Sequence, residues 1–185
     1  MIKTSFTIKD LENLSGVKAH TIRIWEKRYK LFEPQRSTTN IRSYDIASLQ
    51  KILNIATLNN SGIKISKIAE ISDVELLDRA KEIGVNNQSN DISNFLISMM
   101  KFDHKLFDET YDLCIKNKGF DLTFYQEICT LLNHIGELWA CKTISPAHER
   151  FISTMVKQKL LLRIETNKTQ SNKQDHTYVL YLPEN

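Results

Sequence analysis

The chain has 185 residues, enough for one or two domains, and its 41% hydrophobic and 25% charged residues are typical of a globular protein. Its five Gly and three Pro are too few for a collagen-like chain or a turn-rich all-β fold, so a mainly α fold is expected. No apolar run reaches the roughly 18 residues of a membrane span, and the N-terminus lacks the apolar stretch of a signal peptide. We therefore expect a cytoplasmic protein without membrane contact.

Positive charge is concentrated in the first part of the chain. Residues 1–75 contain 12 Lys and Arg against 8 Asp and Glu, whereas residues 76–185 contain 13 against 14. The net charge of the whole chain is only +3, but its excess positive charge lies in this first segment. This distribution is modest support for binding of a phosphate backbone by residues 1–75.

Two short helices joined by a tight turn are predicted at the start of the chain. Residues 7–10 resemble a helix capping box, with Asp10 in place of Glu or Gln, and Gly16 is placed to end the first helix. Apolar residues at helical spacing, Ile22, Trp25 and Tyr29, then predict a second helix. Two helices separated by a Gly-containing turn indicate a helix-turn-helix.

A hairpin wing and two further helices complete the first predicted domain, residues 1–75. The helical period is broken at Pro34, and alternating apolar and polar residues follow, so residues 31–44 are predicted to form the wing. Asp45 can cap a third helix, which the polar residues 59–62 close. A fourth helix is expected around Ile65 to Ala69. The domain is therefore interpreted as a winged helix-turn-helix.

The rest of the chain is predicted to contain a helix bundle. Residues 76–90 form a polar connector with one short helical pattern. Residues 91–166 contain four helical patterns, which predict an up-down four-helix bundle. Residues 167–185 are predicted to be a linker followed by a β-strand at 177–182. A lone strand has no partner in a helical protein, so we expect it to be the first strand of a truncated α/β domain.

The second helix is the candidate reader of a duplex. A recognition helix presents its N-terminal residues to base edges and phosphates, and here those positions are polar or basic. The alternative is an ordinary solvated basic helix face. The residues expected to contact DNA from this helix and its flanks are Lys18, His20, Thr21, Arg23, Lys27 and Arg28.

The wing offers further DNA-binding candidates. Arg36, Asn40 and Arg42 can follow the phosphate backbone or enter the minor groove, where Arg is favoured. Tyr44 can donate its hydroxyl to a phosphate or pack under the wing, and the two roles are compatible.

The segment from Thr7 to Ala69 resembles the DNA-binding domain of MerR-family regulators. The resemblance implies that the helix bearing Arg23 enters the major groove and that the operator is palindromic. It also implies a homo-oligomer on DNA, and RNA polymerase is a candidate partner. The long helix with which this family usually dimerises is not expected here, because residues 72–90 are polar and interrupted. The residues that carry the resemblance are Ser15-Gly16-Val17, Thr21 to Glu26, Tyr29, Pro34-Gln35-Arg36, Asn40-Ile41-Arg42 and Tyr44.

The bundle resembles the helical half of a cobalamin-binding module, as found in light-sensing repressors of carotenoid synthesis. Gly136 to Trp139 and Ile144 to Arg150 carry this resemblance. It implies that Trp139 and Glu149 face the upper side of the corrin, whereas Arg150 stands where the family has His. An α/β domain supplies the lower cobalt ligand in that family. We therefore expect cobalamin as a cofactor of the complete protein, and no tight binding by these 185 residues.

The sequence does not predict an enzyme or a metal site. It contains no HExxH pair, no P-loop, no dinucleotide-binding glycines and no nucleophile motif. The three cysteines match no zinc or redox spacing and are expected to be buried free thiols. The first hypothesis is a sequence-specific transcriptional regulator controlled by a ligand through its bundle. The alternative is a cofactor-free regulator or sensor, whose bundle binds another small molecule or serves oligomerisation; Trp139 would then fill the bundle core.

Overall fold

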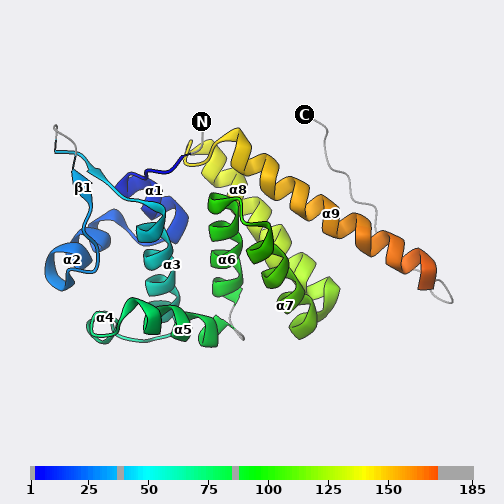
Figure 1. The fold of residues 1–185 in the computed structure, drawn as a ribbon, viewed down its shortest axis with the longest axis horizontal. Coiled ribbons are helices and arrows are strands. Elements are labelled where there is room, and N and C mark those ends of the chain that lie inside the picture. The colour runs from blue at the N-terminus through cyan, green and yellow to red at the C-terminus, as the bar shows by residue number, and fades with distance from the viewer. Residues whose placement is uncertain (1–2, 37–39, 85–87, 171–185) are drawn as a thin grey trace.

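The structure, a computed structural model, describes residues 3–36, 40–84 and 88–170. Within these ranges it is mainly helical, with a small helix-turn-helix domain at one end and a bundle at the other (Figure 1). None of the described helices is long and apolar enough to cross a membrane. The first domain contains α1 (Ile8–Ser15), α2 (Ala19–Tyr29), β1 (Gln35–Arg36), β2 (Arg42–Ser43), α3 (Ile46–Asn60) and α4 (Ile65–Ile68).

The predicted capping signals form as expected. The Thr7 hydroxyl accepts a hydrogen bond from the Asp10 amide at 3.2 Å, and the Thr7 amide donates to the Asp10 carboxylate at 2.8 Å. Gly16 ends α1 with a φ of 71°, a left-handed conformation that glycine adopts without strain. Asp45 caps α3 by accepting from the Ser48 amide at 2.8 Å.

The wing hairpin is short and anchored to the N-terminal arm. Strands β1 and β2 are antiparallel, with Gln35 opposite Ser43 and Arg36 opposite Arg42. Beyond them, Phe6 and Tyr44 exchange two backbone hydrogen bonds of 2.8 Å. Phe6 and Tyr44 are both buried, as are Ile22 and Trp25 of α2, so the wing and α2 share one core.

A longer helix than expected connects the two halves. Helix α5 (Asp73–Gly84) begins before the predicted boundary at residue 75 and occupies most of the predicted connector. Leu76 and Ala80 are buried, and α5 packs against α3 and α6 (Gln88–Lys101). The short helical pattern predicted in this segment is confirmed, and its narrow apolar stripe is enough to dock one face of a helix.

The four predicted bundle helices are present, with different junctions. After α6 come α7 (His104–Leu122), the π-helix η1 (Thr123–Ile128), α8 (Cys129–Ala140) and α9 (Pro146–Gln170). Helix α7 is kinked at Gly119, where the glycine has a φ of 76°. Helix α9 continues to Gln170, four residues beyond the predicted bundle limit at 166. The predicted strand at 177–182 lies outside the described residues.

A buried ionic cluster joins α6, α7 and η1. The Lys118 ammonium donates to the Asp91 carboxylate at 2.8 Å and also to Glu127, which is fully buried. Burial raises the pKa of Glu127, although Lys118 acts in the opposite direction. Asp91 also contacts the buried thiol of Cys114, whose pKa is raised to about 12, chiefly by burial. These groups fix the register of the three elements, because each charge depends on the others for hydrogen bonds.

The cysteine prediction is correct for one residue of three. Cys114 is buried, but Cys129 is half-buried and Cys141 is exposed at the end of α8. The apolar run that suggested burial of Cys141 ends at the helix terminus, where the chain turns at the surface.

The two halves pack side by side through α3 and α6 (Figure 1). Lys101 at the end of α6 donates to the Gln50 side chain of α3 at 2.6 Å. An open groove of about 540 Å³ lies beside this contact. Its lining includes Leu14 of α1, Leu53 of α3, Leu96 of α6 and His134 of α8. The halves are therefore in firm contact along part of their boundary and separated along the rest.

Candidate nucleic-acid interface

Helix α2 presents a basic face to solvent and an apolar face to the core. His20, Arg23, Lys27 and Arg28 are exposed and Thr21 is half-buried, whereas the helix buries Ile22 and Trp25. The Arg28 guanidinium lies 5.5 Å from the ring centroid of Tyr29, within the range of a cation–π contact. The predicted division of α2 into a core face and an exposed basic face is confirmed.

The N-terminus of α2 is also suited to an anion. Lys18 is the N-cap residue, and no side chain caps the helix; the first turn contains no acidic residue. The first amides of a helix have no partners within it and carry a partial positive charge, so they favour a phosphate. The Lys18 ammonium is 3.8 Å from Glu12 and largely exposed, so it remains available to a ligand near this helix end.

Glu26 ties the wing to α2, a role that the sequence did not predict. Its carboxylate accepts from the Arg42 guanidinium at 3.1 and 3.2 Å and from the Tyr44 hydroxyl at 3.1 Å. Tyr44 is buried; this burial, together with Glu26, raises the pKa of its phenol to about 12. Tyr44 therefore packs under the wing with its hydroxyl turned to Glu26, and Arg42 is held at the root of the hairpin.

The outer wing residues are more accessible. The Arg36 guanidinium donates to the Asn40 side-chain oxygen at 2.7 Å, and both residues are exposed. Arg36 also lies 4.0 Å from the Glu26 carboxylate, at the limit of an ion pair. Asn40 has a φ of 60°, which Asn tolerates in tight turns. Arg36 and Asn40 therefore remain at the surface of the wing, whereas Arg42 on the same hairpin is hydrogen-bonded to Glu26.

A second candidate surface lies where α8 and α9 meet. Trp139 is 47% exposed near the end of α8, so it does not fill the bundle core as the alternative interpretation required. In the first turn of α9, Glu149 is half-buried and Arg150 is exposed. Among the described residues, Glu149 makes no side-chain hydrogen bond or ion pair. An exposed indole at the end of one helix and a carboxylate in the first turn of the next are unusual in a bundle that has a well-formed core of its own.

His148, next to Glu149, points the other way. Its side chain is fully buried, its ring stacks on Phe102 with centroids 4.9 Å apart, and its Nδ1 lies 2.8 Å from the Ser145 hydroxyl. The Nε2 atom has no hydrogen-bond partner among the described residues. Burial and, to a smaller extent, the nearby Lys3 lower the pKa of His148. His148 is therefore part of the bundle interior and is not a surface residue.

These features define a class of protein: a winged helix-turn-helix with a basic exposed helix, followed by a helix bundle. Residues 6–75 match the family model of the MerR HTH family regulatory protein, so this part of the chain is a MerR-family helix-turn-helix domain.

Three regulators are similar to the chain. The HTH-type transcriptional repressor CarH of Myxococcus xanthus is 23% identical over 169 residues, which are 87% of this chain and 56% of that protein. The HTH-type transcriptional regulator MlrA of Escherichia coli (strain K12) is 29% identical over 73 residues, 40% of this chain and 30% of the relative. The HTH-type transcriptional regulator TnrA of Bacillus subtilis (strain 168) is 32% identical over 66 residues, 36% of this chain and 59% of the relative.

The extent of these alignments differs between the two halves of the chain. The alignments with MlrA and TnrA are about as long as the helix-turn-helix domain, whereas the alignment with CarH is long enough to extend into the bundle. The chain spans less than two thirds of the length of each of these relatives.

Proposed function

We propose that the protein is a sequence-specific transcriptional regulator that binds double-stranded DNA through α2 and the wing. The observation that carries this proposal is the exposed basic face of α2 beside a hairpin held to it by Glu26. In Figure 1 this end of the molecule lies away from α9, so a duplex can approach it without meeting the bundle. The similarity to three HTH-type transcriptional regulators supports the same proposal.

The proposed contacts divide into two groups. Arg23 and the flanking His20 and Thr21 stand in the first turns of α2, where a recognition helix reads base edges. Arg36 and Asn40 of the wing would contact flanking backbone. Residues proposed to bind phosphate around α2 are Lys18, Lys27 and Arg28.

Arg42 and Tyr44 have a different proposed role. Both are hydrogen-bonded to Glu26, so their main contribution to DNA binding is to position the wing relative to α2. For Arg42 this differs from the expectation of a direct contact with DNA, because no pattern in the sequence indicates a bond to Glu26. For Tyr44 it agrees with the predicted alternative of packing under the wing.

A palindromic operator and a homo-oligomer on DNA follow from the domain type, since two-fold sites require two copies of a recognition helix. Such a regulator would act in the cytoplasm, and RNA polymerase is a candidate partner at the promoter. Repression rather than activation is favoured by the similarity to a transcriptional repressor along most of the chain.

We further propose that the bundle is the upper half of a cobalamin-type module. The exposed Trp139 indole, and the Glu149 carboxylate without a side-chain partner among the described residues, are suited to one face of a large planar ring. Trp139 would stack on the corrin and Glu149 would accept a hydrogen bond from its rim, with Arg150 beside it. The corrin would supply a broad, flat surface that excludes water from the indole. Because this is one face only, binding by the described residues alone is expected to be weak.

Oligomerisation is a second proposed role for the bundle. Leu161, Leu162 and Ile164 are exposed in the C-terminal half of α9. Clustered exposed aliphatic side chains on one helix are typical of a contact surface. Substituting Leu161 and Leu162 with Gln should shift the mass measured by light scattering toward the monomer. An unchanged mass would remove α9 from any contact between copies.

Selection of bound duplexes from a random pool tests the DNA-binding proposal. The chain should enrich a palindromic motif and bind it about 10³-fold or more tightly than a shuffled duplex at physiological salt. Equal affinity for all duplexes would reject sequence-specific binding, and no affinity at low salt would reject DNA binding altogether.

A spectroscopic titration tests the cobalamin proposal. Adenosylcobalamin added in the dark should show weak, saturable binding that Trp139→Ala abolishes and Thr154→Ala, on the exposed side of α9, leaves unchanged. Binding that is indifferent to Trp139 would contradict the proposed face.

A further inference from the structure

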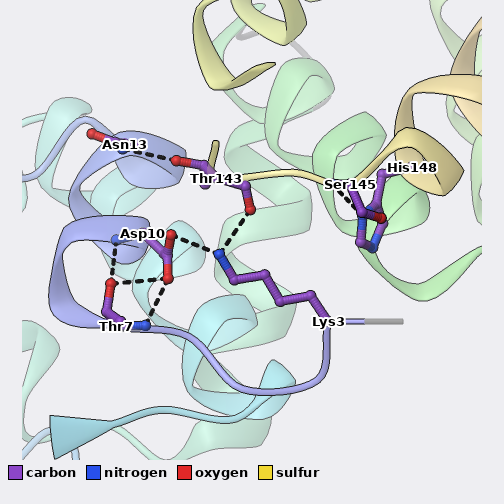
Figure 2. A network of polar contacts seen from close by, with 7 residues as sticks. All are labelled: Lys3, Thr7, Asp10, Asn13, Thr143, Ser145 and His148. Carbon is purple, nitrogen blue, oxygen red and sulfur yellow. Dashed lines mark hydrogen bonds and ion pairs between the residues drawn. The ribbon is translucent and has the colours of Figure 1, made fainter. Parts of the chain in front are cut away.

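Two side chains from the N-terminal segment hold the turn between α8 and α9. The Asn13 amide of α1 donates to the Thr143 hydroxyl at 2.8 Å. The Lys3 ammonium donates to the Thr143 carbonyl at 2.9 Å and to the Asp10 carboxylate at 2.8 Å (Figure 2). Thr143 is fully buried, although it lies in a turn. The DNA-binding domain therefore makes directed polar contacts with one residue of the bundle that is 130 positions or more away in sequence.

The same turn is braced from the bundle side. The Thr143 amide donates to the Leu138 carbonyl at 2.9 Å, one residue before Trp139. Two residues later, the Ser145 amide donates to His148 Nδ1 at 3.2 Å, one residue before Glu149 (Figure 2). Thr143 is thus linked through one or two hydrogen bonds to the helix ends that carry Trp139 and Glu149.

On the side of the first domain, the residues that contact the turn belong to or adjoin α1 of the helix-turn-helix. Asp10 is part of the capping box of α1, and α1 packs against both α2 and α3. The open groove of about 540 Å³ between α1 and α8 means that contact between these two helices is incomplete. A shift of the turn would be felt by α1 through Thr143 and its partners.

We propose that the turn of residues 141–145 couples the Trp139–Glu149 surface to the DNA-binding domain. Occupation of that surface moves or stiffens the turn, and Lys3 and Asn13 pass the change to α1. Coupling between sites is reciprocal, so DNA bound to α2 must alter the turn by the same free energy. The inference rests on the proposed function in two respects: the first domain binds DNA, and the surface of Trp139 and Glu149 takes a ligand.

Hydrogen exchange of the intact chain tests this reciprocity without a bundle ligand. The probe is the palindromic duplex enriched by the chain itself, or a 30-base-pair mixed-sequence duplex at low salt if none is enriched. Saturating duplex should slow amide exchange in residues 138–148 by about five-fold or more. The variant Thr143→Val removes the hydroxyl that Asn13 contacts at almost constant volume, and Lys3→Met removes the ammonium but keeps the stem. In the double variant the slowing should fall below about two-fold, whereas DNA affinity should change little.

Matched controls keep the outcome interpretable. Thr154→Val, at an exposed position of α9, and Lys9→Met, at an exposed position of α1, should both retain the slowing. If the double variant does not fold, Lys3→Met alone serves, because Lys3 approaches the turn from the surface. Two results would overturn the coupling and leave the proposed DNA binding intact. In one, the unmodified chain binds the duplex but amide exchange in residues 138–148 is not slowed. In the other, this exchange is slowed to the same extent in the folded variants. Absence of any duplex binding by anisotropy would overturn both.

Discussion

Glu26 of α2 and Arg42 of β2 are joined by two hydrogen bonds of 3.1 and 3.2 Å, and this pair fixes the wing relative to the proposed recognition helix. The Glu26 side chain is mostly buried and Arg42 is partly so; the pair is therefore better shielded from water than a surface ion pair. The two elements proposed to contact DNA are then held as one rigid unit before any duplex binds, which lowers the entropy lost on association.

A double-mutant cycle measures the strength of this pair. Glu26→Gln, Arg42→Met and the double variant should give a coupling of about 0.5–2 kcal/mol in the free energy of unfolding. The partial exposure of Arg42 keeps the expected value below that of a fully buried pair. Urea unfolding of the four proteins provides the measurement, and additive effects of the two single changes would show that the wing is not held by this contact.

The two wing arginines should differ in how they affect DNA binding. Arg36→Ala should lower the slope of log affinity against log salt by about one, because a single phosphate contact is lost. Arg42→Ala should weaken binding with a smaller change in slope, since Arg42 acts mainly through Glu26. Anisotropy titrations at four salt concentrations distinguish the two effects. Equal slopes for both variants would mean that Arg42 contacts phosphate directly.

Replacement of the two tryptophans, Trp25 and Trp139, should lower the stability of the protein by different amounts. Trp25 is 5% exposed in the core of the first domain, whereas Trp139 is 47% exposed. Trp25→Ala should destabilise the domain by about 3–5 kcal/mol, which can unfold a domain this small. Trp139→Ala should change stability by less than about 0.5 kcal/mol, as expected for an exposed residue. Thermal melts followed by circular dichroism test both, and comparable losses in the two variants would contradict this assignment of core and surface.

His148 should make stability depend on pH. Burial, and to a smaller extent Lys3, holds the pKa of His148 below its usual value in the folded state. The unfolded chain, with an ordinary histidine pKa of about 6.5, therefore takes up the proton first as the pH falls. The stabilising contribution is full above that pH and is lost progressively as the solution becomes more acidic.

The matched variant for this prediction is His148→Asn, which keeps a hydrogen-bond acceptor near Ser145 but does not titrate. Urea unfolding at pH 8 and pH 5 should show a smaller loss of stability in the variant than in the unmodified chain. Identical losses would mean that His148 is protonated as easily in the folded protein as in the unfolded one.

Local signals in the sequence predicted the first domain well. The capping pattern at Thr7 and Asp10, the glycine at position 16 and the cap at Asp45 each act within a few residues, so they are readable from sequence alone. The division of α2 into core and surface was predicted for the same reason. The predicted DNA contacts themselves stay predictions.

Contacts between distant residues were not predictable from sequence patterns. Glu26 pairs with side chains 16 and 18 positions away, and Thr143 with a residue 130 positions away, and no periodicity encodes such pairs. Helix α5 was underestimated because its apolar stripe is narrow and becomes informative only when α3 is present to cover it. The exposure of Trp139 could not be foreseen either, since the position of a helix end relative to the bundle core depends on packing.

The central claim, that α2 reads DNA, is tested most directly by Arg23→Ala. Arg23 is exposed in the first turns of α2, so its removal should leave the melting temperature unchanged and weaken binding to the selected duplex by roughly 1–3 kcal/mol, about 5- to 150-fold. Lys9→Ala, an equally charged and exposed change on α1, should alter the affinity by less than two-fold. Fluorescence anisotropy gives both values under identical salt. A folded Arg23→Ala protein that binds the selected duplex as tightly as the unmodified chain would contradict the assignment of α2 as the recognition helix.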